Sequence, residues 1–491
     1  MPLKPRHPSV RPAACHLPLQ GRIYGIPLRF RLGYACPMRL RLSALATRPW
    51  LVALLLGLAA QLLFTLHIDQ PGQIMFDEVH YVPAAKTLIE LSGPRNTEHP
   101  LLGKELIGAG MDLLGDNPFG WRLMPTIAGT ATVLGIFAFL WILMRGRMRV
   151  AVTGAVLAML NQSLFVQART AMLDVFLGAF LLWGMVFLLW AMHGTRGQVR
   201  WRWCVGAALL GLATAVKWAA APYIAVFGLA LIAVRLRDAR RARRPIATAL
   251  FSGDQPHWPG LSTLAALVLL GAISIPVYFA TFAPTFFYLT GATDGLRGLL
   301  HLQREMYEQQ TQVLPHHTYQ SEWWSWPLML RPVWYYFHGN NDVTPHTISG
   351  VWCIGNALIW WASVPAFVIA AYVSWKQEIR ITRGAIGPLG LVAAFGLGQW
   401  LAWGIKERAL NFMHYYFECI PFACVAIAYF GYRLWTSEAG GPDAQRVRRS
   451  IVAAYAAGVV LWFIFYYPLL SAYPISEWYY GQHLWLGRQW V

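Results

Sequence analysis

The sequence predicts an all-α polytopic membrane protein with about eleven transmembrane helices. Of its 491 residues, 57% are hydrophobic and only 13% are charged, which is unusual for a soluble chain. The apolar residues form long runs, and a helix needs roughly 20 such residues to cross a bilayer. Clusters of Arg and Lys occupy every second loop between the runs, as the positive-inside rule requires of cytoplasmic loops.

The expected spans follow one another along most of the chain. They are about 50–67, 119–144, 150–166, 172–192, 203–216, 219–234, 262–282, 350–374, 385–404, 411–432 and 450–470. The stretch 203–234 is too long for one ordinary crossing and contains Lys217 and Pro222. Because proline disrupts a helix interior, we expect two short helices there.

The charge distribution predicts the orientation in the inner (plasma) membrane. Basic clusters fall near 145–149, 196–202, 235–244, 376–383 and 446–449. Since such loops remain cytoplasmic, we expect a cytoplasmic N-terminus and an outer C-terminus. The long segments 68–118 and 283–349 then lie outside. The net charge of +18 does not indicate nucleic-acid binding, which needs one clustered basic face.

Three parts are expected along the chain. Residues 1–49 form a basic cytoplasmic arm, with Met38 as an alternative start; residues 50–432 form the transmembrane core. Residues 433–491 comprise a cytoplasmic linker, the last span and an outer tail. The six cysteines lack the spacing of a zinc site or a disulfide framework, so no metal site is predicted.

The two long outer segments are patterned. Residues 84–91 and 101–114 resemble amphipathic helices lying at the membrane surface, and Gly93-Pro94 breaks the chain between them. The second segment carries an amphipathic stretch, 296–309, and then an aromatic stretch, 316–327. The aromatic stretch is typical of an interfacial belt, but a loop this long between spans is more often functional or disordered. Its aromatic content argues against disorder.

An acidic pair stands out in the first outer segment. Asp77 and Glu78 follow the first apolar run closely. Carboxylates at a membrane boundary are costly to desolvate and therefore mark a candidate functional site. The alternative is two solvated acids in an ordinary loop.

Cations share the face predicted for Asp77: Lys104, Arg122, Arg169, Lys217 and Arg408. Each alone could extend its charge to lipid headgroups. Together they indicate a functional site, because the positive-inside rule predicts few cations on the outer face. Asp174 lies five residues after Arg169, and we expect those two to form a structural ion pair.

A carboxylate among cations suits transfer of a sugar from a lipid phosphate. The leaving phosphate is a stable anion whose developing charge needs cations, and the acceptor hydroxyl needs a carboxylate base. A single displacement at the anomeric carbon of the sugar, with inversion of its configuration, then completes the transfer. Glycosidases, by contrast, use two carboxylates because their leaving group must be protonated.

Seven motifs carry a family resemblance. They are Phe76–Tyr81, His99–Lys104, Arg122–Pro125, Arg169–Asp174, Gly211–Trp218, Tyr319–Pro327 and His414–Tyr416. Because these motifs occur in this order, the chain resembles the protein O-mannosyltransferases. These are members of the GT-C class of polytopic glycosyltransferases, which use polyprenyl-phosphate sugars. Leu101 departs from the family pattern, which has a second proline there. The segment 283–349 is too short for the β-module insert of eukaryotic members, which points to a bacterial-type member.

The resemblance implies a set of roles. Asp77 would be the catalytic base, and Glu78 would position the acceptor or hold the loop. Arg122 and Lys217 would bind the donor phosphate, and topology adds Lys104 and Arg408 to that group. Further candidates for the donor or acceptor site are His80, His99, Tyr319, Trp323, His414 and Tyr415.

The expected function is therefore inverting transfer of mannose from polyprenyl-phosphate mannose to Ser/Thr hydroxyls of secreted proteins, on the outer membrane face. No other cofactor is identified, and divalent-metal dependence and oligomeric state are left open. One alternative is a related transferase that modifies a lipid or glycan, such as an aminoarabinose transferase. A remote alternative is a transporter, but transporters place charges at the midplane and contain internal repeats.

Overall fold

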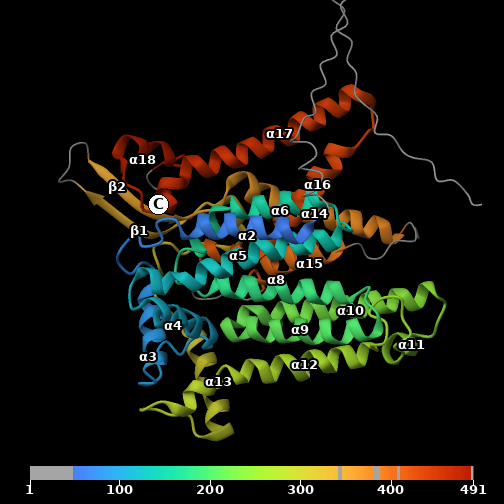
Figure 1. Ribbon diagram of the computed structural model, residues 1–491, viewed down its shortest axis with the longest axis horizontal. Coiled ribbons are helices and arrows are strands. Elements are labelled where there is room, and N and C mark those ends of the chain that lie inside the picture. The colour runs from blue at the N-terminus through green and yellow to red at the C-terminus, as the bar shows by residue number, and fades with distance from the viewer. Residues whose placement is uncertain (1–47, 341–345, 380–387, 406–409, 488–489, 491) are drawn as a thin grey trace, which may run out of the picture. The chain divides into compact units, whose positions relative to one another are not determined.

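Most of the chain is helical in the computed structural model (Figure 1), which describes residues 48–340, 346–379, 388–405, 410–487 and 490. The predicted arm, apart from its last two residues, and the candidate Arg408 lie outside the described residues. The described chain forms one unit that begins at Pro49.

Each predicted span overlaps a helix. These helices are α2 (Pro49–Thr65), α5 (Pro118–Leu143), α6 (Met148–Met159), α8 (Asp174–Ala191), α9 (Arg196–Val216), α10 (Ala221–Arg241), α12 (Thr263–Ala280), α14 (Ala357–Ile379), α15 (Pro388–Ala402), α16 (Ile420–Thr436) and α17 (Gly441–Tyr466). In the described part of the chain, seven helical segments are long and apolar enough to cross a membrane, while α2, α6 and α15 are apolar but shorter. The protein is therefore a multi-pass membrane protein; the predicted number of eleven crossings stays a prediction.

Short helices connect or extend the long ones. They are α3 (Glu78–Ile89), α4 (Leu102–Leu114), α7 (Gln162–Gln167), η1 (Trp218–Ala220), α11 (Ile246–Phe251), η2 (Ala283–Phe287), α13 (Gly295–Gln310), η3 (Trp323–Leu328), η4 (Met413–Cys419), η5 (Tyr467–Leu470) and α18 (Glu477–His483). The amphipathic stretches predicted in the two long segments are confirmed as α3, α4 and α13. The predicted span 150–166 is split instead, because the Asn161 side chain caps a new helix by accepting from the Leu164 N–H.

The predicted break within 203–234 is confirmed and falls at Lys217, but α9 and α10 on either side of it have 21 residues each and are not short. The Lys217 backbone is extended, with φ −158° and ψ 135°, where α9 ends and η1 begins. Gly211, two turns earlier, lets α9 approach α12 closely: a Cβ there would lie 2.6 Å from the Ser274 carbonyl oxygen. The end of α9 is thus held firmly against its neighbour while the chain changes direction.

A three-stranded antiparallel sheet was not predicted. Strand β1 (Val333–Asn340) pairs with β2 (Thr347–Cys353), and β2 pairs with β3 (Ile475–Ser476). Aromatic and β-branched residues favour strands; β1 is rich in aromatic residues, and β2 contains several β-branched ones. The expected span 350–374 was wrong at its start, because β2 occupies 347–353 and α14 begins only at Ala357.

The two long polar segments gather at one end of the long helices. Figure 1 shows α3, α4, α13 and the β1–β2 hairpin at the left ends of α8, α9 and α12, with α11 at the opposite end. Helix α4 packs on α3, α5 and α9. Helix α8 lies between α5 and α9 and is buried along nearly its whole length, as expected of a helix that is apolar on all sides.

Candidate active site

A strained residue precedes Asp77. Phe76 has φ 46°, a left-handed conformation that costs a non-glycine residue about 1–3 kcal/mol. Its ring stacks on Tyr335 of β1 at 4.3 Å between centroids and meets His414 of η4 edge-on at 5.7 Å. Aromatic residues from two distant segments thus hold the turn that presents Asp77 at the start of α3.

The surroundings of Asp77 make it a stronger base than an ordinary aspartate. Burial raises the pKa of Asp77 to about 6, while nearby Lys217 and His80 and a hydrogen bond with Tyr81 act in the opposite direction. At neutral pH the carboxylate is ionised and still basic enough to accept a proton, which is the compromise that general-base catalysis requires.

Glu78 points away from solvent into an ion pair. Its Oε1 and Oε2 accept hydrogen bonds from Nε and Nη2 of Arg122, both at 2.8 Å, and neither side chain is exposed. The backbone N–H groups of Ala171 and Met75 donate to the same carboxylate. Glu78 therefore ties α3 to α5 and to the start of α8.

Arg122 also fixes the loop that leads to Asp77. Its Nη1 donates to the carbonyl oxygens of Ile68 and Pro71, and Nη2 donates to that of Gln73. Together with the two bonds to Glu78, these contacts engage all five guanidinium N–H donors. This geometry does not favour the phosphate-binding role predicted for Arg122, because no guanidinium N–H group remains to donate to a ligand.

The Lys104 ammonium also forms its hydrogen bonds within the protein. It is fully buried, and Nζ donates to the carbonyl oxygens of Asn96 and His99. Burial lowers the pKa of Lys104 to about 7. The side chain stabilises the loop before α4, so the geometry also speaks against the predicted contact between Lys104 and the donor phosphate.

Asp174 has a different partner from the one expected. Its Oδ1 accepts a hydrogen bond from Lys217 Nζ at 2.9 Å, and both residues are buried. Arg169 instead donates to the carbonyl oxygens at the end of α2, among them Phe64 and His67. The predicted Arg169–Asp174 pair is thus wrong, because α8 packs its first turn against the end of α9, where Lys217 projects.

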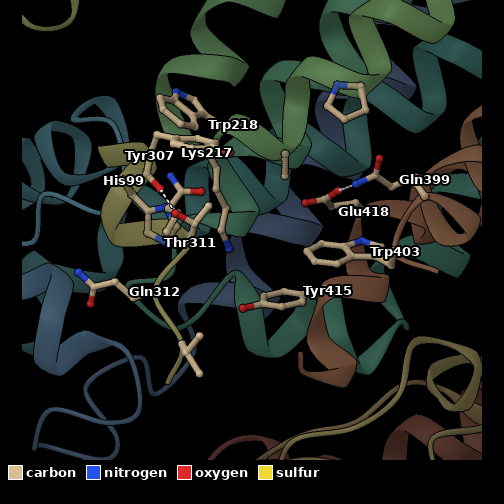
Figure 2. Close-up of a pocket in the computed structure, with 15 residues that line it drawn as sticks. His99, Lys217, Trp218, Tyr307, Thr311, Gln312, Gln399, Trp403, Tyr415 and Glu418 are labelled. Atoms are coloured by element: carbon tan, nitrogen blue, oxygen red, sulfur yellow. Dashed lines mark hydrogen bonds between the residues drawn. The ribbon is translucent and has the colours of Figure 1, made fainter. Parts of the chain in front are cut away.

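Lys217 reaches into a cavity of about 680 Å³. Figure 2 shows its side chain directed into the same space as Tyr415, Trp403 and Glu418. Nζ lies 5.1 Å from the centroid of the Tyr415 ring. Among the described residues, Asp174 is its one hydrogen-bond partner, so two of the three ammonium N–H groups are available to a ligand.

Residues from distant segments form the cavity wall. The lining residues are His99, Lys217, Trp218, Ala219, Pro222, Tyr307, Gln310, Thr311, Gln312, Val313, Gln399, Ala402, Trp403, Tyr415 and Glu418. The predicted candidates His99, Lys217 and Tyr415 are therefore brought together. Asp77 is not in the wall itself, although Lys217 lies close enough to act on its charge.

The remaining candidates within the described residues do not line this cavity. His414 is buried against Phe76 and Tyr335. Trp323 packs edge-on against Trp400 at 5.5 Å. Tyr319 lies beside His317 and His80 is exposed. In the described part of the chain, no three His, Cys, Asp or Glu side chains gather as they would around a metal ion.

Sequence reasoning missed several polar residues of the cavity, among them Glu418 and Gln399. Gln399 Nε2 of α15 donates to Glu418 Oε2 of η4. An acidic residue inside an otherwise apolar predicted span, 411–432, was the available signal, since ionisable groups within spans mark functional sites.

Comparison with known proteins adds independent information. A family model described as dolichyl-phosphate-mannose-protein mannosyltransferase matches residues 114–290, and one described as the C-terminal four-transmembrane region of protein O-mannosyltransferase matches residues 295–490. Two curated relatives are named polyprenol-phosphate-mannose–protein mannosyltransferase. The one from Mycobacterium tuberculosis is 28% identical over 89% of this chain and 91% of its own length. The one from Corynebacterium glutamicum is 27% identical over 91% and 94%.

A solved structure shares the fold. The Saccharomyces cerevisiae protein O-mannosyltransferase Pmt1-Pmt2 complex bound to the sugar donor aligns with a TM-score of 0.73, covering 89% of this chain and 92% of that chain at 13% identity. The all-α polytopic GT-C fold predicted from the sequence is confirmed by this likeness.

Proposed function

The chain belongs to the protein O-mannosyltransferase family, and from this premise we propose how its site works. The enzyme is a glycosyltransferase that moves mannose from a polyprenyl-phosphate donor to proteins. We assign the acceptor group as a Ser or Thr hydroxyl, Asp77 as the base and Lys217 as the cation that receives the donor phosphate.

The reaction is a single displacement. The acceptor oxygen bonds to the anomeric carbon of mannose while the bond from that carbon to the phosphate oxygen breaks. The hydroxyl proton passes to the Asp77 carboxylate, and the bonding electron pair leaves with the polyprenyl phosphate. Because the acceptor attacks opposite the leaving group, the configuration at the anomeric carbon inverts.

One observation carries this assignment: Lys217, which lines the cavity, lies within electrostatic reach of the Asp77 carboxylate. Lys217 affects the pKa of Asp77 and has ammonium N–H groups directed into the cavity. A cation at the leaving oxygen stabilises the charge that develops there. A carboxylate on the other side of the reacting carbon takes up the proton.

Buried ion pairs support the two reactive groups. The Glu78–Arg122 pair fixes the loop that carries Asp77, and Asp174 orients Lys217. We therefore assign Glu78, Arg122, Lys104 and Asp174 as positioning residues. Groups held in this way need little reorganisation when the reaction occurs, which is how preorganised sites lower a barrier.

We place the reaction on the outer face of the inner membrane. The polar segments that carry Asp77 and α13 gather at one end of the long helices, and basic loops alternate with them along the sequence. By the positive-inside rule the basic loops are cytoplasmic. The acceptors are then proteins that have crossed the membrane.

A transfer assay in membranes tests this function. The assay uses labelled polyprenyl-phosphate mannose, a secreted Ser/Thr-rich acceptor and the wild-type chain beside Asp77→Asn. We expect the label to reach acceptor hydroxyls with wild type only. Asp112→Asn makes the same chemical change at an exposed position in the same outer segment and should leave transfer intact. Near-normal transfer by Asp77→Asn would remove Asp77 as the base.

A further inference from the structure

Glu418 is a buried carboxylate with no role in the mechanism described so far. It is 2% exposed, lines the cavity and belongs to the apolar segment Met413–Thr436, which is long enough to cross the membrane. No cation of the described chain forms a salt bridge with it, and Lys217, on the same cavity wall, is paired with Asp174. A carboxylate in such a segment is expensive to maintain and by default marks a function.

One oxygen of Glu418 is held in place by a neighbour. Gln399, itself buried and lining the cavity, donates from Nε2 to Oε2. Figure 2 shows the carboxylate directed from this contact toward the centre of the cavity, on the side opposite His99 and Tyr307. The buried Tyr223 also interacts with this carboxylate. A carboxylate has about four acceptor sites, so these two contacts leave acceptor capacity for a ligand.

The wall beside Glu418 is aromatic. Trp403 and Tyr415 stack with their ring centroids 4.8 Å apart and their planes within 10°. Flat apolar faces beside a fixed carboxylate and an amide suit a pyranose ring, which has apolar C–H faces and hydroxyl groups around its edge. Pockets of this kind bind through an apolar lining and orient the ligand through a few polar groups.

The polar groups of the cavity give the donor a direction. The Lys217 ammonium attracts the donor phosphate, whereas the acceptor oxygens of Glu418 suit the hydroxyl groups of a sugar. The phosphate therefore belongs at Lys217, and the sugar extends toward the opposite side of the cavity.

We propose that Glu418, oriented by Gln399, accepts a hydrogen bond from a hydroxyl group of the sugar that is transferred, and so selects that sugar. This assignment rests on the proposed function, because it places the donor's sugar beside Lys217. It makes Glu418 a specificity-determining residue of the reaction.

The test pairs a change in the enzyme with a change in the donor. Initial rates are measured for polyprenyl-phosphate mannose and for analogues in which one mannose hydroxyl is replaced by hydrogen. We expect wild type to prefer the intact donor over one analogue by at least about 100-fold, since a site built for a hydroxyl rejects ligands that lack it. Methionine is similar in length to glutamate and accepts no strong hydrogen bond. In Glu418→Met, the rates with the intact donor and with that analogue should therefore differ by no more than about threefold.

Two further variants complete the test. Glu418→Gln keeps the shape of the side chain but has one acceptor oxygen where glutamate has two, and Gln399 competes for that oxygen. We therefore expect the ratio of the rates with the intact donor and the analogue to fall about five- to tenfold. Glu438→Met makes the matched change at an exposed position beyond the far end of α16 and should behave as wild type.

Each outcome decides a separate question. A preference for the intact donor that is unchanged in both Glu418 variants would overturn the assignment of Glu418. A wild-type enzyme that uses every analogue as well as the intact donor would overturn it as well. If wild type transfers no mannose from the intact donor, the proposed function itself fails, before Glu418 is considered.

Discussion

The Glu78 carboxylate and the Arg122 guanidinium form two hydrogen bonds of 2.8 Å in complete burial, one residue away from the half-buried Asp77. Neighbouring acids in the sequence therefore have opposite environments. The charge of Glu78 is compensated by Arg122 inside the protein, whereas burial raises the pKa of Asp77. One residue organises the loop and the other is left to react.

Breaking the Glu78–Arg122 pair should destabilise the fold. Glu78→Gln leaves the Arg122 charge buried without its counter-ion, and such a loss costs about 3–5 kcal/mol. The free energy of unfolding in detergent measures this change. Glu90→Gln, an exposed change at the end of the same helix, should have little effect. Equal unfolding free energies for the two variants would contradict the structural role of Glu78.

The transfer rate should depend on pH through Asp77. Because burial raises its pKa to about 6, the carboxylate is ionised above that pH and protonated below it. We expect kcat/KM to be constant above pH 6 and to fall about tenfold per pH unit below it. The profile is measured in a pH range where the detergent-solubilised enzyme stays folded. A profile that is flat through pH 6 would exclude Asp77 as the titrating base.

Loss of the Lys217 charge should impair use of the donor. Lys217→Met removes the ammonium that faces the cavity, and removal of one preorganised charge-stabilising donor typically lowers kcat by about 10²–10³-fold. The readout is kcat/KM at limiting polyprenyl-phosphate mannose. Lys86→Met, in which an exposed lysine of α3 is changed, should retain wild-type kinetics. Unchanged donor kinetics in Lys217→Met would remove it from the phosphate site.

Cysteine labelling should establish which end of the helices faces outward. Glu90 and Arg240 are both exposed, the first in the segment predicted outside and the second in a loop predicted inside. In intact cells, a membrane-impermeant thiol reagent should label Glu90→Cys and not Arg240→Cys, while the parent chain gives the background. The reverse pattern would invert the topology.

The sequence was a good guide wherever hydrophobicity or charge acted locally. It located the helices, the break at Lys217 and the acidic pair, because each depends on residues close together in the chain. It failed for contacts between distant segments: Asp174 was assigned to Arg169, five residues away, instead of Lys217, 43 residues away. Strand β2 was missed because its apolar end, Val351–Cys353, merged with the apolar run that follows it.

The small sheet joins the end of the chain to its first long loop. Strand β3 pairs with β2 and β2 with β1, and Tyr335 of β1 stacks on Phe76 beside Asp77. The Tyr466 hydroxyl donates to the His483 carbonyl oxygen, and Trp490 Nε1 donates to that of Met329, which anchors the same end further. A purification tag or a truncation near residue 480 would therefore alter the catalytic loop from some 400 residues away, and protein engineers should leave that terminus intact.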